Sequence, residues 1–243
     1  MAVAGHPGGS QPAESAVLSR GASVETLEPR PSITAPRALF AIAFAFFLIG
    51  FLLREDYGST WDEAESYEAG RRNLEIVAAL AAGERGDIEW PWHELPSHQL
   101  VLDTLRAATA DAIERWLPAS PAPIGERLFN LALTSSSLLL AGLLVLEVTA
   151  SASLAAIAAT ALALQPKLIA HAQNNPKDLP GVVVFTLGVL MVVRLEARPS
   201  GLRAIAAAAA IGLAISTWLP AIALMPVAAF VLLAHWRRAA SSR

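Results

Sequence analysis

Several apolar runs, each near the length needed to cross a bilayer, constrain this chain more than any other feature. They occupy residues 38–53, 128–148, 151–170, 181–193, 204–218 and 221–236. A transmembrane helix needs about 20 mostly apolar residues to cross roughly 30 Å of hydrocarbon. Hydrophobic residues form 54% of the chain and charged residues only 16%, which is unusual for a soluble domain. We therefore expect an all-α, polytopic bundle of about six transmembrane helices.

The first apolar run, residues 38–53, lies between Arg37 and Arg54. We interpret it as a retained transmembrane helix. Residues 1–37 are rich in Gly, Pro, Ser and Ala and have no apolar periodicity, so we expect a disordered tail. A cleavable signal peptide is the alternative, but the preceding tail is long and no small-x-small cleavage site comes before Arg54.

Positive charges at the ends of the runs predict the orientation in the membrane. They follow the fourth run and the sixth run, at Arg194, Arg198, Arg203, Arg237, Arg238 and Arg243. Because short cytoplasmic loops carry an excess of Lys and Arg, we expect residues 1–37 and 237–243 to be cytoplasmic. Each span moves the chain to the other side of the membrane. Counting the first span and the helices of residues 128–236 therefore places the outer loop, residues 54–127, on the same outer face as the short loop of residues 171–180.

The outer loop has two amphipathic patterns. Thr60 and Glu63 have the spacing of a capping box and predict a helix from there to about Ala82. A second helix is predicted from Gln99 to about Leu117. Its apolar face carries Val101, Leu105, Ala108, Ala112 and Trp116, and the opposite, polar face carries Asp103, Arg106, Asp111 and Arg115. Amphipathic helices of this kind commonly lie flat at a membrane surface.

Charge, cysteine content and motifs exclude several functions. The net charge is −3 with no block of Lys or Arg, so we expect no nucleic-acid partner. The chain has no Cys, so it has no disulfide and no thiolate chemistry. It also contains no phosphate-binding loop, no G-x-S-x-G, no H-E-x-x-H and no dinucleotide fingerprint.

Three acids are candidates for chemistry at the outer face: Asp62, Glu63 and Asp178. The alternative for the Asp62–Glu63 pair is capping of a helix N-terminus, where carboxylates are favoured. Asp178 lies in a polar run next to hydrocarbon, where polar groups are costly without partners. Its alternative is a plain ion pair with Lys177, with Asn174 capping the next helix.

Two motifs carry a family resemblance: S-T-W-D-E-A-E-S-Y at residues 59–67 and H-A-Q-N-N-P-K-D-L-P at residues 171–180. With the first span, they resemble the GT-C membrane glycosyltransferases. The closer likeness is to bacterial relatives of the protein O-mannosyltransferases and of the lipid A aminoarabinose transferases. Typical members continue through several more spans, so we expect an N-terminal or shortened form. A separately encoded C-terminal remainder is the partner that such a form would need.

The resemblance implies inverting transfer of a hexose or pentose from a polyprenyl-phosphate-linked donor to an acceptor at the outer face. Asp62 would be the base or orienting carboxylate, Glu63 would assist it, and Asp178 would position the acceptor. Asp62 and Asp178 would also hold Mg²⁺ or Mn²⁺, if a divalent cation takes part. The substrate-binding residues would be His171, Asn175, Lys177, Arg127 and Tyr67.

Two other functions remain as alternatives. One is a non-catalytic or truncated membrane helix bundle that serves as a scaffold. The other is a transporter, for which only Pro220 and Pro226 hint at broken helices. The flanking Arg residues, the Ala-rich composition and the resemblance together favour a bacterial inner membrane, with membrane lipids as surroundings.

Overall fold

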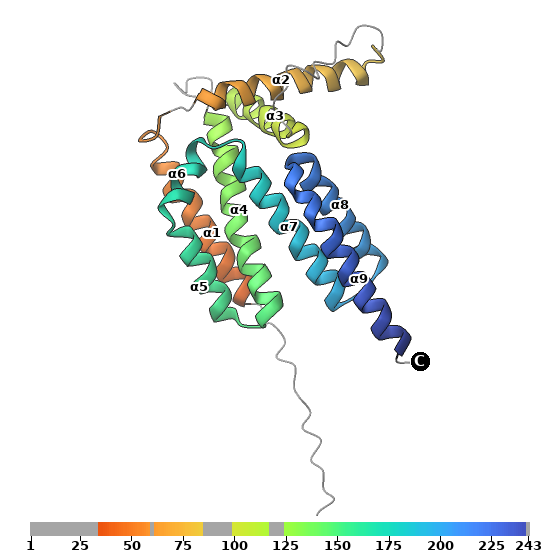
Figure 1. The fold of residues 1–243 in the computed structure, drawn as a ribbon. Helices are drawn as coiled ribbons and strands as arrows, with labels where there is room; N and C mark the ends of the chain where they lie inside the picture. Colours follow the sequence, from red (N-terminus) through yellow and green to blue (C-terminus); the bar gives the residue numbers. More distant parts are fainter. Residues whose placement is uncertain (1–33, 59–60, 85–98, 117–123, 242–243) are drawn as a thin grey trace, which may run out of the picture. The chain divides into compact units, whose positions relative to one another are not determined.

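The computed structural model describes residues 34–58, 61–84, 99–116 and 124–241, all within one compact unit of the chain. The side chains of residues 61–63, 235 and 238–241, and nearly all of the expected N-terminal tail, lie outside the description. The helices are α1 (Thr34–Leu52), α2 (Trp61–Ala81), α3 (Leu100–Trp116), α4 (Ile124–Thr149), α5 (Ala152–Ala163), α6 (Pro166–Asn174), α7 (Asp178–Ala197), α8 (Gly201–Thr217), η1 (Leu219–Ala223) and α9 (Leu224–Ser241) (Figure 1). The expectation of an all-α bundle is confirmed for this part of the chain.

Three helices, α1, α4 and α7, are each long and apolar enough to cross a membrane. The pair α5–α6 meets the same test when it is counted as one broken span. The last two apolar runs correspond to α8 and to η1 with α9, which are shorter apolar helices. The described residues therefore contain three or four full spans, together with these two shorter segments.

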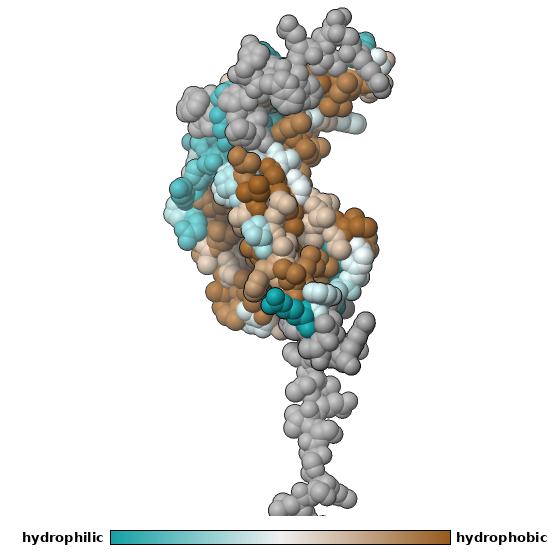
Figure 2. Space-filling model, turned by 45° about the vertical axis from the view of Figure 1, so that its right-hand side comes forward, coloured by the Kyte–Doolittle hydropathy of each residue, from teal (hydrophilic) through white to brown (hydrophobic). Residues whose placement is uncertain are grey.

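Helix α1 shows how the sequence separates protein-facing from lipid-facing residues. Its buried residues, Ala35, Leu39, Ala43, Phe46 and Gly50, recur every three or four positions and so share one face. Large apolar residues also cover the outside of the bundle; Phe40 is 62% exposed and Phe230 73%. Hydrophobic residues accordingly cover much of the helical surface shown in Figure 2. Such a surface suits hydrocarbon and is unfavourable in water.

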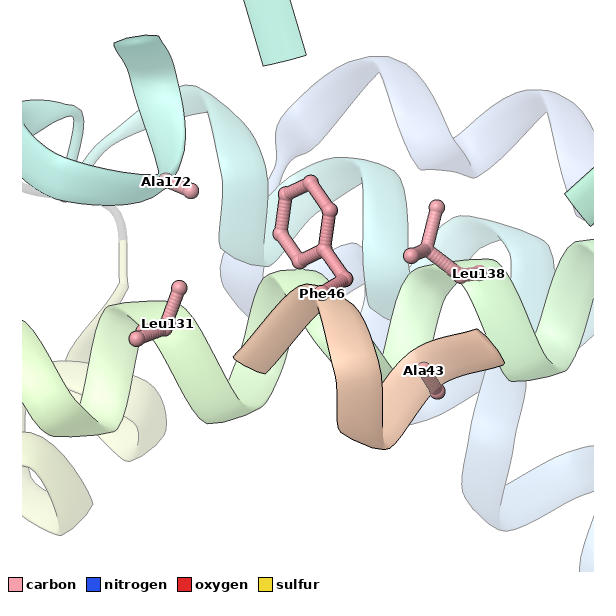
Figure 3. Close-up of a cluster of buried hydrophobic side chains, with 5 residues drawn as sticks. All are labelled: Ala43, Phe46, Leu131, Leu138 and Ala172. Atoms are coloured by element: carbon pink, nitrogen blue, oxygen red, sulfur yellow. The ribbon is translucent and has the colours of Figure 1, made fainter. Parts of the chain in front are cut away.

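The core around α1 joins helices that are distant in the sequence. Figure 3 shows its buried side chains: Ala43 and Phe46 from α1, Leu131 and Leu138 from α4, and Ala172 from α6. Helix α4 also packs against α3, α5 and α7. The core thus fixes the position of α6, which leads into the polar segment of residues 171–180.

The third apolar run, expected as one helix over residues 151–170, is divided in the structure. Helix α5 ends at Ala163 and α6 begins at Pro166, with a bend of 64° between them. Proline has no backbone N–H and its ring clashes with the carbonyl four residues earlier, so it stops a helix but is accepted in the first turn of the next one.

The loop expected over residues 171–180 is also much shorter than predicted. His171 belongs to the end of α6, and Asp178 is the first residue of α7. Only residues 175–177 lie between the two helices. Pro180 does not exclude the helix, because it lies in the first turn of α7, where no intrahelical N–H bond is required.

The two outer helices, α2 and α3, lie side by side at the end of the bundle where α4 and α7 begin (Figure 1). Helix α2 begins at Trp61, directly after Thr60, as the capping-box spacing predicts. The polar face of α3 points into the protein: the side chains of Asp103 and Arg106 are each 2% exposed. Its apolar stripe faces outward, and Trp116 is 86% exposed. This arrangement fits a helix at the membrane interface.

Candidate functional site

The junction between α6 and α7 is organised by the amide of Asn175. Its Oδ1 accepts hydrogen bonds from the backbone N–H of Lys177 (3.1 Å) and of Asp178 (2.9 Å). Its Nδ2 donates to Asp178 Oδ2 at 3.0 Å. The amide thus satisfies N–H groups that begin α7 without a helical partner. The sequence interpretation gives this capping role to Asn174. In the structure Asn174 is the last residue of α6, and Asn175, the first residue after that helix, fills the role.

The same amide sets the tautomer of His171. Asn175 Nδ2 lies 2.7 Å from His171 Nδ1. Because the backbone N–H groups of residues 177 and 178 can only donate, the amide oxygen must face them and the amide nitrogen must face the imidazole. In a neutral imidazole Nδ1 is then the acceptor, and the proton is carried by Nε2. His171 can therefore offer an N–H donor from Nε2.

Lys177 links this junction to the outer helix α2. Its Nζ lies 3.1 Å from Glu65 Oε2, and the two side chains are 33% and 40% exposed. The contact spans 112 positions of sequence. Sequence reasoning missed Glu65, although the residue stands in the same W-D-E-A-E run as the expected acids. An exposed pair of this kind contributes little to stability, at most about 1 kcal/mol.

Asp62 and Glu63 lie in the first turn of α2, and their side chains are outside the described residues. Position 62 precedes position 65 by three residues, so the two positions share one side of the helix. Since Glu65 reaches Lys177, this side of α2 is the one beside the α6–α7 junction. The role of the two acids stays a prediction.

The other two expected binding residues make their described contacts elsewhere. Arg127, in the first turn of α4, is buried and donates from Nη1 to the carbonyl of Arg54 at 2.6 Å. Tyr67 lies on α2 under the guanidinium of Arg71, which is 4.7 Å from the ring centroid. Arg71 in turn pairs with Asp111 of α3 at 2.8 Å. Tyr67 thus belongs to the contact between α2 and α3.

The surroundings of Tyr67 disfavour ionisation of its phenol. Partial burial raises its pKa from the ordinary value of 10.0, and the nearby carboxylates of Glu114 and Asp111 act in the same direction, while Arg71 opposes them. The phenol therefore remains protonated throughout the neutral pH range and can donate as well as accept a hydrogen bond.

An apolar pocket of about 360 Å³ lies beside α6, between α1 and the bend of α5–α6. Gln173, which is 1% exposed, lines it and donates from Nε2 to the carbonyl of Gly50 at 2.8 Å. Apart from Thr160, Gly50 and Gln173, the lining is hydrophobic. This composition suits a hydrocarbon chain better than a sugar.

Among the described residues, no group of three or more His, Asp or Glu side chains is close enough to hold a metal ion. Asp178 is exposed and has the Asn175 amide as a described partner. The expected Mg²⁺ or Mn²⁺ site also needs Asp62, whose side chain is outside the description, so that site stays a prediction.

Comparison with known protein families identifies what this chain is similar to. A family model described as dolichyl-phosphate-mannose-protein mannosyltransferase matches residues 107–242, more than half of the chain. The matched region begins within α3 and contains the whole α6–α7 junction, but it does not include α2. The comparisons with curated proteins and with solved structures give no match.

Proposed function

The chain belongs to the dolichyl-phosphate-mannose-protein mannosyltransferase family, and we propose that it transfers one sugar from a polyprenyl-phosphate-linked donor to an acceptor. The proposed transfer takes place at the face of the membrane where the α6–α7 junction lies. Membership makes it a multi-pass membrane protein of the GT-C glycosyltransferase type. The observation that carries the proposal is the Lys177–Glu65 contact. It joins the acidic start of α2 to a junction that holds Asp178, His171 and Lys177.

The proposed reaction is a single displacement at the anomeric carbon of the sugar. The acceptor hydroxyl gives its proton to the carboxylate of Asp62, assisted by Glu63, while its oxygen forms the new glycosidic bond. The bond between the anomeric carbon and the phosphate oxygen breaks, and the polyprenyl phosphate leaves with the electron pair. Because attack and departure occur on opposite sides, the configuration inverts.

The junction offers groups for both ends of this displacement. The ammonium of Lys177 and the Nε2–H of His171 suit the leaving phosphate, whose negative charge grows as the bond breaks. The exposed carboxylate of Asp178 suits the acceptor, and Asn175 holds it in place through the 3.0 Å hydrogen bond. A divalent cation, if bound, would use the hard oxygens of Asp62 and Asp178.

The family's name supports our proposal for the sugar, and the charge pattern supports our proposal for the location. A hexose of the mannose type is the proposed sugar, with a pentose as the alternative. The proposed location is a bacterial inner membrane, with the junction on the outer face. The short segments at the other ends of α7 and α9 carry Arg194, Arg198, Arg203 and Arg237, and short cytoplasmic segments are typically rich in Arg. A separately encoded partner that completes the donor site is part of the same proposal.

The test is sugar transfer by the purified chain in liposomes, with radiolabelled polyprenyl-phosphate hexoses and pentoses as donors. Asp62→Asn and Asp178→Asn should each abolish transfer without changing the thermal midpoint. The matched control is Glu75→Gln, the same loss of charge at an exposed residue of α2. Transfer that persists in Asp62→Asn would remove its role as base. No transfer from any donor would favour the scaffold function instead.

A further inference from the structure

We infer that α3 is the positioning element of the site: Arg106 and Gln99 hold two successive backbone carbonyls of the α6–α7 junction and so fix the place of Lys177 and Asp178. This inference rests on the proposed function for its effect on transfer. The contacts themselves come from the geometry alone. Neither residue is expected to touch the donor or the acceptor.

Arg106 supports the first carbonyl from inside the protein. Its side chain is 2% exposed, and Nη2 pairs with Asp103 Oδ1 at 2.6 Å. Its Nη1 donates to the carbonyl oxygen of Pro176 at 3.4 Å. Pro176 is itself buried and precedes α7, so its carbonyl belongs to neither helix. The planar fork of a guanidinium can serve two acceptors at once, which a single ammonium cannot do with the same geometry.

Gln99, the residue directly before α3, supports the next carbonyl. Its Nε2 donates to the carbonyl oxygen of Lys177, 78 positions away. A carbonyl can only accept, so it orients the amide with the nitrogen toward the junction. The side chain is buried, at 6% exposure. Two donors, one on α3 and one directly before it, therefore bind the two residues that immediately precede Asp178.

Simple packing does not account for this pair of residues. Arg106 Nε and Gln99 Oε1 are buried and have no hydrogen-bond partner among the described atoms. Apolar side chains of similar size would fill the same space without leaving polar atoms unsatisfied, and a buried ion pair is weak evidence for stability. An apolar pair could not donate the hydrogen bonds that orient the carbonyls of Pro176 and Lys177.

The test uses the full-length chain in liposomes and two variants. Gln99→Met keeps the length of the side chain but removes the donor, and Arg106→Lys keeps a cation beside Asp103 but loses the fork. Thr104→Ala is the control on the same helix, because Thr104 Oγ1 donates only within α3, to the carbonyl of Leu100. Amide hydrogen exchange at residues 175, 177 and 178, which carry a backbone N–H, is measured along with kcat, KM and the thermal midpoint.

Both variants should speed exchange at residues 175, 177 and 178 by about tenfold or more, because the junction opens more easily. They should also lower kcat, on the order of 10²-fold, with a much smaller change in donor KM, since a misplacement of about 1 Å has an effect of that size. Thr104→Ala should leave both quantities unchanged.

The outcomes separate the two proposals. Unchanged exchange in Gln99→Met and Arg106→Lys would overturn the hold on the junction, whatever the activity. Faster exchange with unchanged kcat would overturn the positioning role, as would a lower midpoint with full activity per folded molecule. Absence of transfer in the unaltered chain would instead overturn the proposed function, and exchange alone would then decide whether α3 holds the junction.

Discussion

Asn175 uses the two ends of one amide for different tasks. Its oxygen accepts from the first N–H groups of α7, and its nitrogen serves Asp178 and His171. The capping task needs only an acceptor, which a carboxylate also supplies. The second task needs a donor, which a carboxylate lacks. The two functions of this residue can therefore be separated by a substitution.

Asn175→Asp should keep the fold but lower transfer by roughly tenfold or more, because it removes the donor to His171 and places a second negative charge beside Asp178. The comparison is with Asn175→Ala, which also loses the cap and should reduce the free energy of unfolding by about 1 kcal/mol. Transfer and thermal unfolding in detergent check both variants. Full transfer by Asn175→Asp would contradict the role of the amide donor.

Tyr67 allows a titration at a single residue, because the chain has only two Tyr. In a Tyr57→Phe background, the absorbance change at 295 nm should place the pKa of Tyr67 above 10.0. A raised folded-state pKa stabilises the fold below the unfolded pKa, and this contribution is lost as the pH rises through the folded value. Removing the Glu114 charge by Glu114→Gln should lower the pKa. A midpoint at or below 10.0 would contradict the partly buried setting of the phenol.

At the scale of elements, contact between α3 and α4 requires a residue without a side chain. A Cβ on Gly125 would meet the Cα of Ala110 and lie 2.9 Å from its carbonyl oxygen, both in the backbone of α3. Gly125→Ala should therefore destabilise the protein by about 1–3 kcal/mol. Gly212→Ala is the opposite case: it has no atom within 4 Å and should stabilise α8 by about 0.5–1 kcal/mol. Thermal unfolding of both variants in the same detergent tests the difference.

The Lys177–Glu65 pair joins α2 to the junction, and substitutions that reverse the charge of each residue test this contact. Each single reversal, Lys177→Glu or Glu65→Lys, should impair transfer and weaken the α2 contact. The double reversal should recover any lost stability, which is at most about 1 kcal/mol for so exposed a pair. It should not recover transfer, because the cation would then lie on α2. A double variant that regains full transfer would show that Lys177 acts only through Glu65.

Local patterns predicted most of the elements but few of the contacts at the site. Apolar length identified α1, α4 and α7, and the Thr60–Glu63 spacing identified the start of α2. The break at Pro166 was predictable, since proline inside an apolar run ends a helix. The Glu65 contact was not, because it depends on tertiary packing between segments 112 positions apart. The burial of Arg106 was not predictable either, because an amphipathic pattern does not show whether its polar face meets water or protein.

At the scale of the whole molecule, the absence of Cys makes a topology experiment direct. Single cysteines at Glu84, beyond α2, and at Pro199, between α7 and α8, occupy exposed positions. A maleimide that cannot cross membranes should label Glu84→Cys in intact bacterial spheroplasts, but Pro199→Cys only after permeabilisation. The reverse pattern would place the α6–α7 junction in the cytoplasm and contradict the proposed outer-face reaction.

The bend at Pro166 also sets where the junction lies at the end of its span. Helices α5 and α6 have 12 and 9 residues and bend by 64°. At ~1.5 Å per residue α6 is about 14 Å long, but it advances only about 6 Å along the axis of α5 and extends about 12 Å to the side. The broken span thus carries His171 and the residues of the junction sideways across its end rather than further out along the axis of α5.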